Sequence, residues 1–289
     1  MEKAPLELRE SVGRAPIAWA RRLSPVSIAS MIAEDVRELI RSRYILRNLV
    51  SAQLKVRYRR SALGFLWALL HPVLMLTVLA TVFSMIMRLP IKDHALYIFS
   101  GLIPWQFFAA SIENGSRSLI DSEFLIRKVR VHKMVFPLAC VTVAAVNMVF
   151  AFVALFVLFQ FVGGSIHPQL VLVPVGVALL GLFAFGASLI VMTLLVWFRD
   201  TEHMIGVLLQ ALYFVSPILY QPGLFGERAV SLMAWNPLTH FLAFFHAAVY
   251  DGVWPSTGTW AAALLWTVAA LGIGYTVYKA NEHEYIFRL

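Results

Sequence analysis

Residues Leu170–Phe198 read LVLVPVGVALLGLFAFGASLIVMTLLVWF, an uninterrupted stretch without Asp, Glu, Lys or Arg. A helix of about 20 apolar residues crosses a hydrocarbon core about 30 Å thick. The stretch exceeds that length, so it predicts a membrane-spanning helix. Small residues recur along it at Gly176, Gly181 and Gly186, which permits close packing against a neighbouring helix.

Further stretches without charged residues occur on both sides of this one. They are Ser61–Met87, Ala95–Ile112, Met134–Gln160, Met204–Phe225 and Gly252–Tyr278. Charged residues make up 14% of the chain, against about 25% in an average soluble domain. The chain therefore lacks the polar residues to cover a water-facing surface. We predict an all-α, polytopic membrane protein with six transmembrane helices.

Basic residues are unevenly distributed around these spans. The segment before the first span is rich in Arg and Lys, and so is segment 113–133 between the second and third spans. The opposite side would hold only Arg88, Lys92 and Arg228. Because cytoplasmic loops carry the excess of Lys and Arg, we expect both termini in the cytoplasm. The net charge of +8 flanks membrane spans, which argues against a nucleic-acid partner.

The segment before the first span has two parts. Residues 1–30 mix Pro, Ser and Arg without a sustained period, which predicts a flexible cytoplasmic arm. Residues 31–60 place Leu39, Leu46 and Leu49 on one helical face, with Arg residues around the rest. This pattern suits the lipid headgroup region and predicts an amphipathic interface helix. The alternative is a solvated helix that packs on a partner.

Residues Ala229–Tyr250 are long enough for a seventh span, but Asn236 and Pro237 lie near their centre. A proline breaks a helix and leaves backbone groups that lipid cannot satisfy. Each half has the length of a re-entrant or interfacial segment. We therefore predict that Ala229–Tyr250 forms two re-entrant half-helices that enter and leave from the periplasmic face.

Motifs for catalysis or nucleotide binding are missing from the sequence. No G-x-x-x-x-G-K-[ST] sequence occurs, so the chain has no P-loop. Cys140 is the only cysteine, which excludes a cysteine metal site within one chain. His71, His240 and His246 lie in apolar surroundings, where hydrogen-bonded structural roles are expected. We therefore expect no enzyme activity, no metal and no cofactor in this chain.

Aromatic residues gather in and around the first, second and fifth spans. Flat aromatic faces suit sugar rings that slide along a pathway, whereas the alternative is ordinary packing or contact with lipid. The candidate path residues are Phe65, Trp67, Trp105, Phe107, Phe108, Tyr213, Phe214 and Tyr220.

Six short motifs follow one another between residues 54 and 237, and together they are more specific than any one alone. They are Leu54–Trp67 leading to Pro72, Gly101–Phe108, Leu125–Lys128 with Pro137, Phe198–Asp200, Ser216–Tyr220 and Asn236–Pro237. In this order they resemble the membrane subunit of type-2 ABC exporters of lipid-linked polysaccharide. The resemblance is closest to O-antigen permeases, with capsule and teichoic-acid permeases near.

This resemblance implies a half-transporter in the bacterial inner membrane. Two copies would pair, and two separate ABC ATPase subunits, which bind ATP and Mg, would dock beneath a transmembrane domain at 61–279 with a cytoplasmic tail at 280–289. The substrate would be a lipid-linked, O-antigen-like glycan of lipopolysaccharide or capsule type.

The resemblance also assigns roles to particular residues. It implies a coupling helix at Ser118–Lys128, in which we expect Glu123, Phe124, Arg127 and Lys128 at the ATPase contact. It also implies two periplasmic re-entrant gate helices within residues 222–258, which would cap the exit of the pathway and contain Asn236 and Pro237. The interface helix would end with Arg57, Tyr58, Arg59 and Arg60.

Two other functions remain open from the sequence. One is a type-2 ABC exporter of small hydrophobic molecules, which would share the fold. The other is a stand-alone membrane glycosyltransferase or flippase, which would need an acidic metal- or sugar-binding site that the sequence does not display.

Overall fold

The computed structural model describes residues 25–58, 70, 74, 78, 81, 82, 85, 91–129, 131–161 and 167–288. Every regular element in this part of the chain is a helix, which confirms the predicted all-α class. The chain divides into two compact units, residues 1–44 and 45–289. Most of the first predicted span, 61–87, lies outside the described residues.

The predicted interface segment contains two helices where one was expected. Helix α2 spans Pro25–Arg41 and α3 spans Arg43–Tyr58. Between them, the Ser42 N–H donates to the carbonyl of Glu38 at 2.9 Å and to that of Leu39 at 3.1 Å. The interruption therefore consists of a single serine, and no glycine or proline marks it in the sequence.

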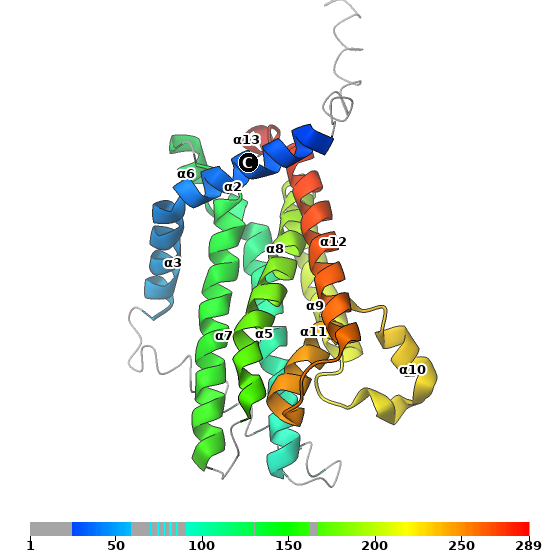
Figure 1. The fold of residues 1–289 in the computed structure, drawn as a ribbon. Helices are drawn as coiled ribbons and strands as arrows, with labels where there is room; N and C mark the ends of the chain where they lie inside the picture. Colours follow the sequence, from blue (N-terminus) through cyan, green and yellow to red (C-terminus); the bar gives the residue numbers. More distant parts are fainter. Residues whose placement is uncertain are drawn as a thin grey trace, which may run out of the picture. The chain divides into compact units, whose positions relative to one another are not determined.

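Four helices of the second unit run side by side (Figure 1). They are α5 (Ile91–Asp121), α7 (Val135–Phe161), α8 (Val173–Trp197) and α12 (Thr257–Asn281). Helix α5 packs on α7 and α8, and α8 packs on α12. Helix α7, helix α8 with the short helix η2 (Pro168–Leu172) before it, and α12 are each long and apolar enough to cross a membrane. The protein is thus a multi-pass membrane protein.

Helices α5 and α9 differ from the spans predicted for them. Glycine and proline disfavour a continuous helix, but α5 continues through Gly101 and Pro104. Buried side chains on both sides of Pro104 hold this helix against its neighbours, and such packing tolerates a proline inside a membrane helix. Helix α9 covers only Thr201–Val215, because a proline at 217 disfavours helical backbone in the preceding residue.

Glycines bring the backbones of α8 and α12 into contact, as the small residues of the sequence predicted. A Cβ atom on Gly186 would lie 2.5 Å from the carbonyl carbon of Ala270. A Cβ atom on Gly274 would overlap the carbonyl oxygen of Gly186. Close approach of two backbones gains van der Waals contact, which drives helix association where lipid removes the hydrophobic effect.

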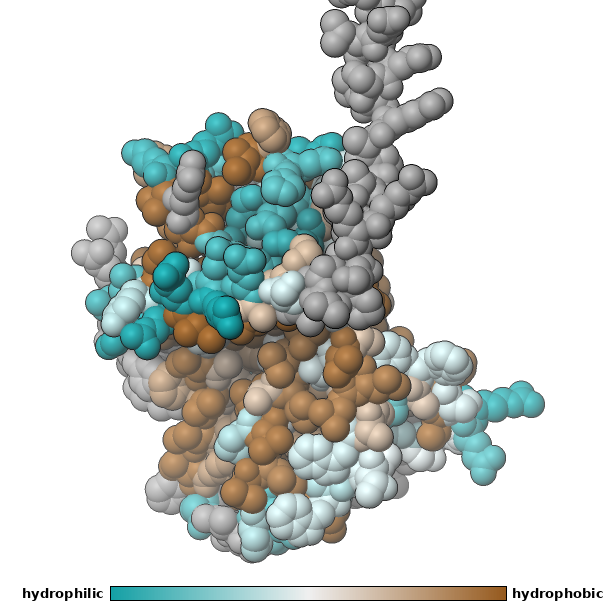
Figure 2. Space-filling model, turned by 45° about the horizontal axis from the view of Figure 1, so that its top comes forward, coloured by the Kyte–Doolittle hydropathy of each residue, from teal (hydrophilic) through white to brown (hydrophobic). Residues whose placement is uncertain are grey.

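The outward sides of the bundle helices are apolar. Val149, Val153 and Val157 form an exposed row on α7, and Leu265 and Val268 are exposed on α12. Brown apolar side chains cover much of the visible bundle surface in Figure 2. Such a surface suits contact with lipid or with another apolar helix.

Short helices connect α9 to α12. They are η3 (Pro222–Phe225), α10 (Gly226–Met233), α11 (Pro237–Phe245) and the π-helical turn η4 (His246–Asp251). The helix is interrupted between α10 and α11, at Asn236 and Pro237, where the sequence predicted a break. Helix α11 is buried against α12, α5 and α8, whereas α10 lies beside the bundle and packs mainly on η3 (Figure 1). The total of six spans and the re-entrant path remain predictions.

Candidate coupling and gate sites

The predicted coupling segment forms a separate short helix. Helix α5 ends at Asp121, and α6 covers Glu123–Lys128. The Ser122 carbonyl accepts from the N–H groups of Leu125 and Ile126, each at 3.0 Å. The coupling helix predicted at Ser118–Lys128 is therefore the last turn of α5 followed by α6.

All four predicted contact residues lie on α6. Glu123 and Arg127 form an ion pair at 2.8 Å, one helical turn apart. The Lys128 Nζ lies 3.9 Å from the centre of the Phe124 ring, and Phe124 is 72% exposed. An exposed aromatic ring flanked by charged groups provides a surface for a protein partner. The ATPase contact itself remains a prediction.

The loop after α6 is joined to the carboxyl-terminal end of the chain. Lys133 Nζ donates to the carbonyl of Glu282, just beyond α12. Burial lowers the pKa of the Lys133 ammonium group, the Glu282 charge raises this pKa, and the Lys279 charge lowers it again. In the short helix α13 (Tyr285–Arg288), the Tyr285 hydroxyl bonds the Thr193 hydroxyl of α8 at 2.7 Å. The loop after α6 is thus linked to the chain just beyond α12, and this end of the chain is linked to α8.

A second anchor connects the ends of α5 and α9. Arg117 Nη1 lies 2.6 Å from the Glu202 carboxylate, and about half of each side chain is exposed. An exposed pair of this kind contributes about 0–1 kcal/mol. The ion pair therefore contributes little to the stability of the fold, and its main effect is to favour the pairing of these two helix ends.

Asn236 connects the two predicted gate helices to the end of α9. Its Oδ1 accepts from the N–H of Leu238 at 3.0 Å and so caps α11, with Pro237 in the first turn. Its Nδ2 donates to the Ser216 hydroxyl at 2.9 Å. The buried amide therefore joins two of the short motifs, Ser216–Tyr220 and Asn236–Pro237.

His246 makes the next contact with the same loop. Its Nε2 donates to the carbonyl of Pro217 at 3.1 Å, and its Nδ1 lies 2.7 Å from the Ser100 hydroxyl of α5. The imidazole ring stacks on the Tyr97 ring, with 4.2 Å between the ring centres. The Tyr97 hydroxyl donates to the carbonyl of Tyr220 at 2.8 Å. His246 is thus a hydrogen-bonded structural histidine, as expected.

We call these contacts the gate anchor. It holds the loop Ser216–Tyr220 at three points, through Asn236, His246 and Tyr97. Of this group, the sequence indicated Asn236 as a gate residue and His246 as a structural histidine, but neither Tyr97 nor Ser100. Tyr97 and Ser100 lie one helical turn apart on α5, and no local pattern distinguishes them from ordinary packing residues.

The candidate path aromatics fall into two sets. Trp105, Phe107 and Phe108 on α5 are buried inside the protein, so they form neither an interfacial belt nor a lipid contact. The ring centres of Trp105 and Tyr213 of α9 are 5.6 Å apart, and Phe108 stacks on Phe183 of α8 with 5.7 Å between the ring centres. These three side chains pack inside the described part of the chain, and their role in a substrate path stays a prediction.

The other set lies around the end of α9. Phe214 is exposed, and the Tyr220 hydroxyl donates to its carbonyl at 2.8 Å. Phe65 and Trp67 lie outside the described residues. The same holds for Arg59 and Arg60 of the interface helix and for the side chains of Arg57 and Tyr58.

Comparison with known proteins finds similar chains among O-antigen export permeases. The chain is 32% identical to the O-antigen export system permease protein RfbA of Myxococcus xanthus over 252 residues, which are 86% of this chain and 97% of that protein. An RfbA permease of Klebsiella pneumoniae is 30% identical over 71% of this chain and 80% of its own length.

A polysialic acid transport protein is also similar. The polysialic acid transport protein KpsM of Escherichia coli is 28% identical over 80% of this chain and 90% of its own length. Residues 45–250 match the family described as ABC-2 type transporter, and this match covers both α6 and the gate anchor. The chain therefore belongs to the ABC-2 type transporter family of membrane proteins.

Proposed function

We propose that this chain is the permease subunit of an ABC exporter that moves a lipid-linked polysaccharide of O-antigen type across the bacterial inner membrane. The similarity to an O-antigen export permease along 97% of that protein's length carries the proposal. The three long apolar helices support a path through the membrane. Both termini would lie in the cytoplasm.

The partners in this proposal are a second copy of the chain and two copies of an ABC ATPase. ATP and Mg would bind to the ATPase, and this chain would contribute no cofactor site and no chemistry of its own. The exposed ring of Phe124 and the charges of Arg127 and Lys128 support α6 as the contact with the ATPase. Lys133 would pass movement of α6 on to α12.

The gate anchor would hold the exit side of the path. Its three contacts restrain the loop Ser216–Tyr220, which ends α9 and leads into the gate helices. The exposed Phe214 and the half-buried Tyr220 would meet sugar rings there. The buried Trp105 and Phe108 would stiffen the wall behind them.

The test is complementation. The chain and its cognate ABC ATPase are expressed in a strain that lacks its own O-antigen permease, and surface glycan is detected with an antibody to the native polymer. We expect export with the intact ATPase and no export when the P-loop lysine of the ATPase is replaced. Export that survives this replacement would contradict the proposal, as would tight ATP binding by the purified chain alone.

A further inference from the structure

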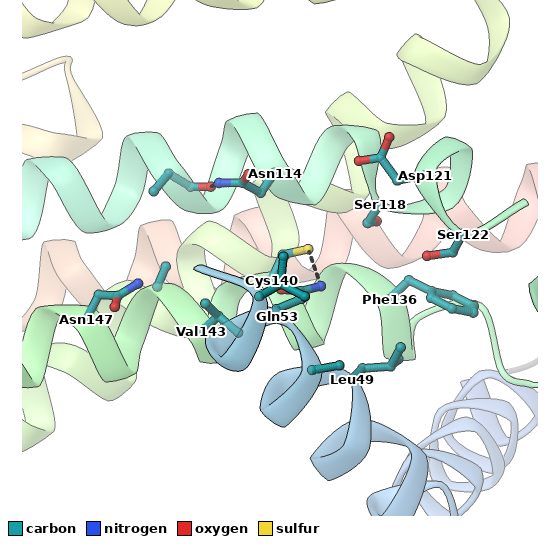
Figure 3. A pocket seen from close by; sticks show the side chains of 14 residues that line it. Leu49, Gln53, Asn114, Ser118, Asp121, Ser122, Phe136, Cys140, Val143 and Asn147 are labelled. Atoms are coloured by element: carbon teal, nitrogen blue, oxygen red, sulfur yellow. Dashed lines mark hydrogen bonds between the residues drawn. The ribbon is translucent and has the colours of Figure 1, made fainter. Parts of the chain in front are cut away.

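A groove of about 490 Å³ opens between α3, α5 and α7 of the second unit. Figure 3 shows its walls, with Gln53 of α3 and Cys140 of α7 turned toward each other. The Gln53 Nε2 lies 3.8 Å from the Cys140 sulfur. Volumes of about 300–1,000 Å³ are typical of small-molecule sites, so the groove has room for a ligand.

Each helix contributes one face to this groove. Helix α5 presents Asn114, Ser118 and Asp121, whose spacing places them on one side of a helix. Helix α7 presents Cys140 and Asn147 in the same way. Each of the three faces also carries apolar side chains, such as Leu49, Val143 and Phe136, so polar groups recur along a partly apolar wall.

The groove begins beside the coupling segment and extends into the membrane. Ser122, next to α6, lines one end, and Asn147 lines the other. From Phe136 to Asn147 the wall rises about 16 Å along α7, roughly half of a hydrocarbon core. Polar side chains at such depth are costly in lipid, and they mark substrate pathways.

The lining favours uncharged, hydroxyl-rich ligands. Gln53, Asn114 and Asn147 carry amides, and Asp121 carries a carboxylate. The Asn114 Nδ2 and the Ser118 hydroxyl donate to carbonyls of α5, so these two residues would meet a ligand through their oxygen atoms as acceptors. Amides both donate and accept, which matches sugar hydroxyls. No Lys or Arg is among the described residues of the lining, and the Asp121 carboxylate would repel a phosphate. A phosphate group is therefore a poor ligand here.

We propose that this groove binds an uncharged sugar residue of the lipid-linked glycan at the cytoplasmic side of the path. The inference rests on the proposed function and names a place where its substrate is held. The groove is separate from the candidate aromatic path, because none of the described path aromatics lines it. The substrate would thus meet amides first and aromatic rings later.

The test is photocrosslinking in cells that express the complete transporter. A photoreactive p-benzoylphenylalanine replaces Asn114 in the groove, or Val153 on the exposed side of α7 as a control. The probe is the host's lipid-linked glycan, labelled with a radioactive sugar. We expect at least fivefold more sugar label on the chain from position 114 than from position 153.

A second pair of variants protects the test against misfolding. Asn114→Leu with Asn147→Leu removes two amides while keeping side-chain volume, and we expect glycan export to fall at least tenfold. Thr276→Val on α12, whose hydroxyl donates to the carbonyl of Gly272 at 3.0 Å, should export normally.

Three outcomes would overturn the inference while leaving the proposed function intact. They are equal sugar label at both positions, label from radioactive phospholipid instead of sugar at position 114, and full export by the double leucine variant. By contrast, absence of glycan export by the unmodified chain with its ATPase would refute the proposed function itself.

Discussion

His246 shows how much a single buried side chain can determine in this protein. It reaches the Pro217 carbonyl, the Ser100 hydroxyl and the Tyr97 ring from one position. Removing one partner of a buried hydrogen bond leaves the other unsatisfied, at a cost of about 1–3 kcal/mol. The gate anchor therefore depends on this imidazole.

We predict that His246→Ala lowers the stability of the purified complex by about 2–4 kcal/mol, because two polar partners and a stacked ring lose their contact. The measurement is the temperature at which the complex loses its monodisperse peak in size-exclusion chromatography. The control is His203→Ala, an exposed histidine at the start of α9, which should have little effect. Equal stability of both variants would show that the gate anchor contributes nothing.

At the scale of the element, α6 is a helix of six residues, none of which is buried. Its internal ion pair contributes about 0.2–0.5 kcal/mol, too little to hold the segment by itself. Its position is determined by the end of α5 and by Lys133. The charges on α6 are therefore available for a partner.

We predict that Arg127→Glu with Lys128→Glu uncouples ATP hydrolysis from export without unfolding the chain, because both groups lie on the exposed surface of α6. The measurement compares ATPase rate and glycan export of the same complex. The matched control exchanges Glu123→Arg and Arg127→Glu, which preserves the ion pair within the helix. Normal export by the exchanged pair would mean that the partner does not recognise these charges.

A second prediction at this scale concerns the contact between α8 and α12. Gly186→Ala would place a Cβ atom 2.5 Å from the Ala270 backbone, so the two helices must separate. We expect a loss of about 1–3 kcal/mol, measured as a lower unfolding temperature in detergent. Gly272→Ala on α12 is the control, because no atom lies within 4 Å of its Cβ. It should be neutral or stabilising by about 0.5–1 kcal/mol.

At the scale of the whole molecule, the path of the chain through the membrane is the main question. Ser231 of α10, Ser256 at the start of α12 and Asn281 at its end mark three points along the carboxyl-terminal third. If α10 and α11 enter and leave from the periplasmic face, Ser231 and Ser256 both lie on the periplasmic side of the membrane. The third then lies in the cytoplasm.

We predict this pattern for single cysteines placed at Ser231, Ser256 or Asn281 in a Cys140→Ser background. A membrane-impermeant thiol reagent added to intact spheroplasts should label the first two positions and spare the third. Labelling of Ser231 and Asn281 but not Ser256 would mean a seventh span between α10 and α12. A lysed sample serves as the control, since all three positions should then react.

The sequence alone determined the class of protein and several of its divisions. Charge-free stretches predicted the long apolar helices, and the proline at 237 predicted the break between α10 and α11. These features are local, because apolar length and a missing backbone N–H act within one segment. The short motifs, taken in order, also indicated the transporter family.

Only the tertiary structure decided which side chains work together. Ser100 and His246 are 146 positions apart in sequence, and Tyr97 lies 123 positions from Tyr220. No periodicity within one segment can express such pairs. The same limit explains Trp105 and Phe108, which the sequence could place in a belt, in a path or in the core. Burial depends on which helices are neighbours, and that arrangement exists only once α5, α8 and α9 pack together.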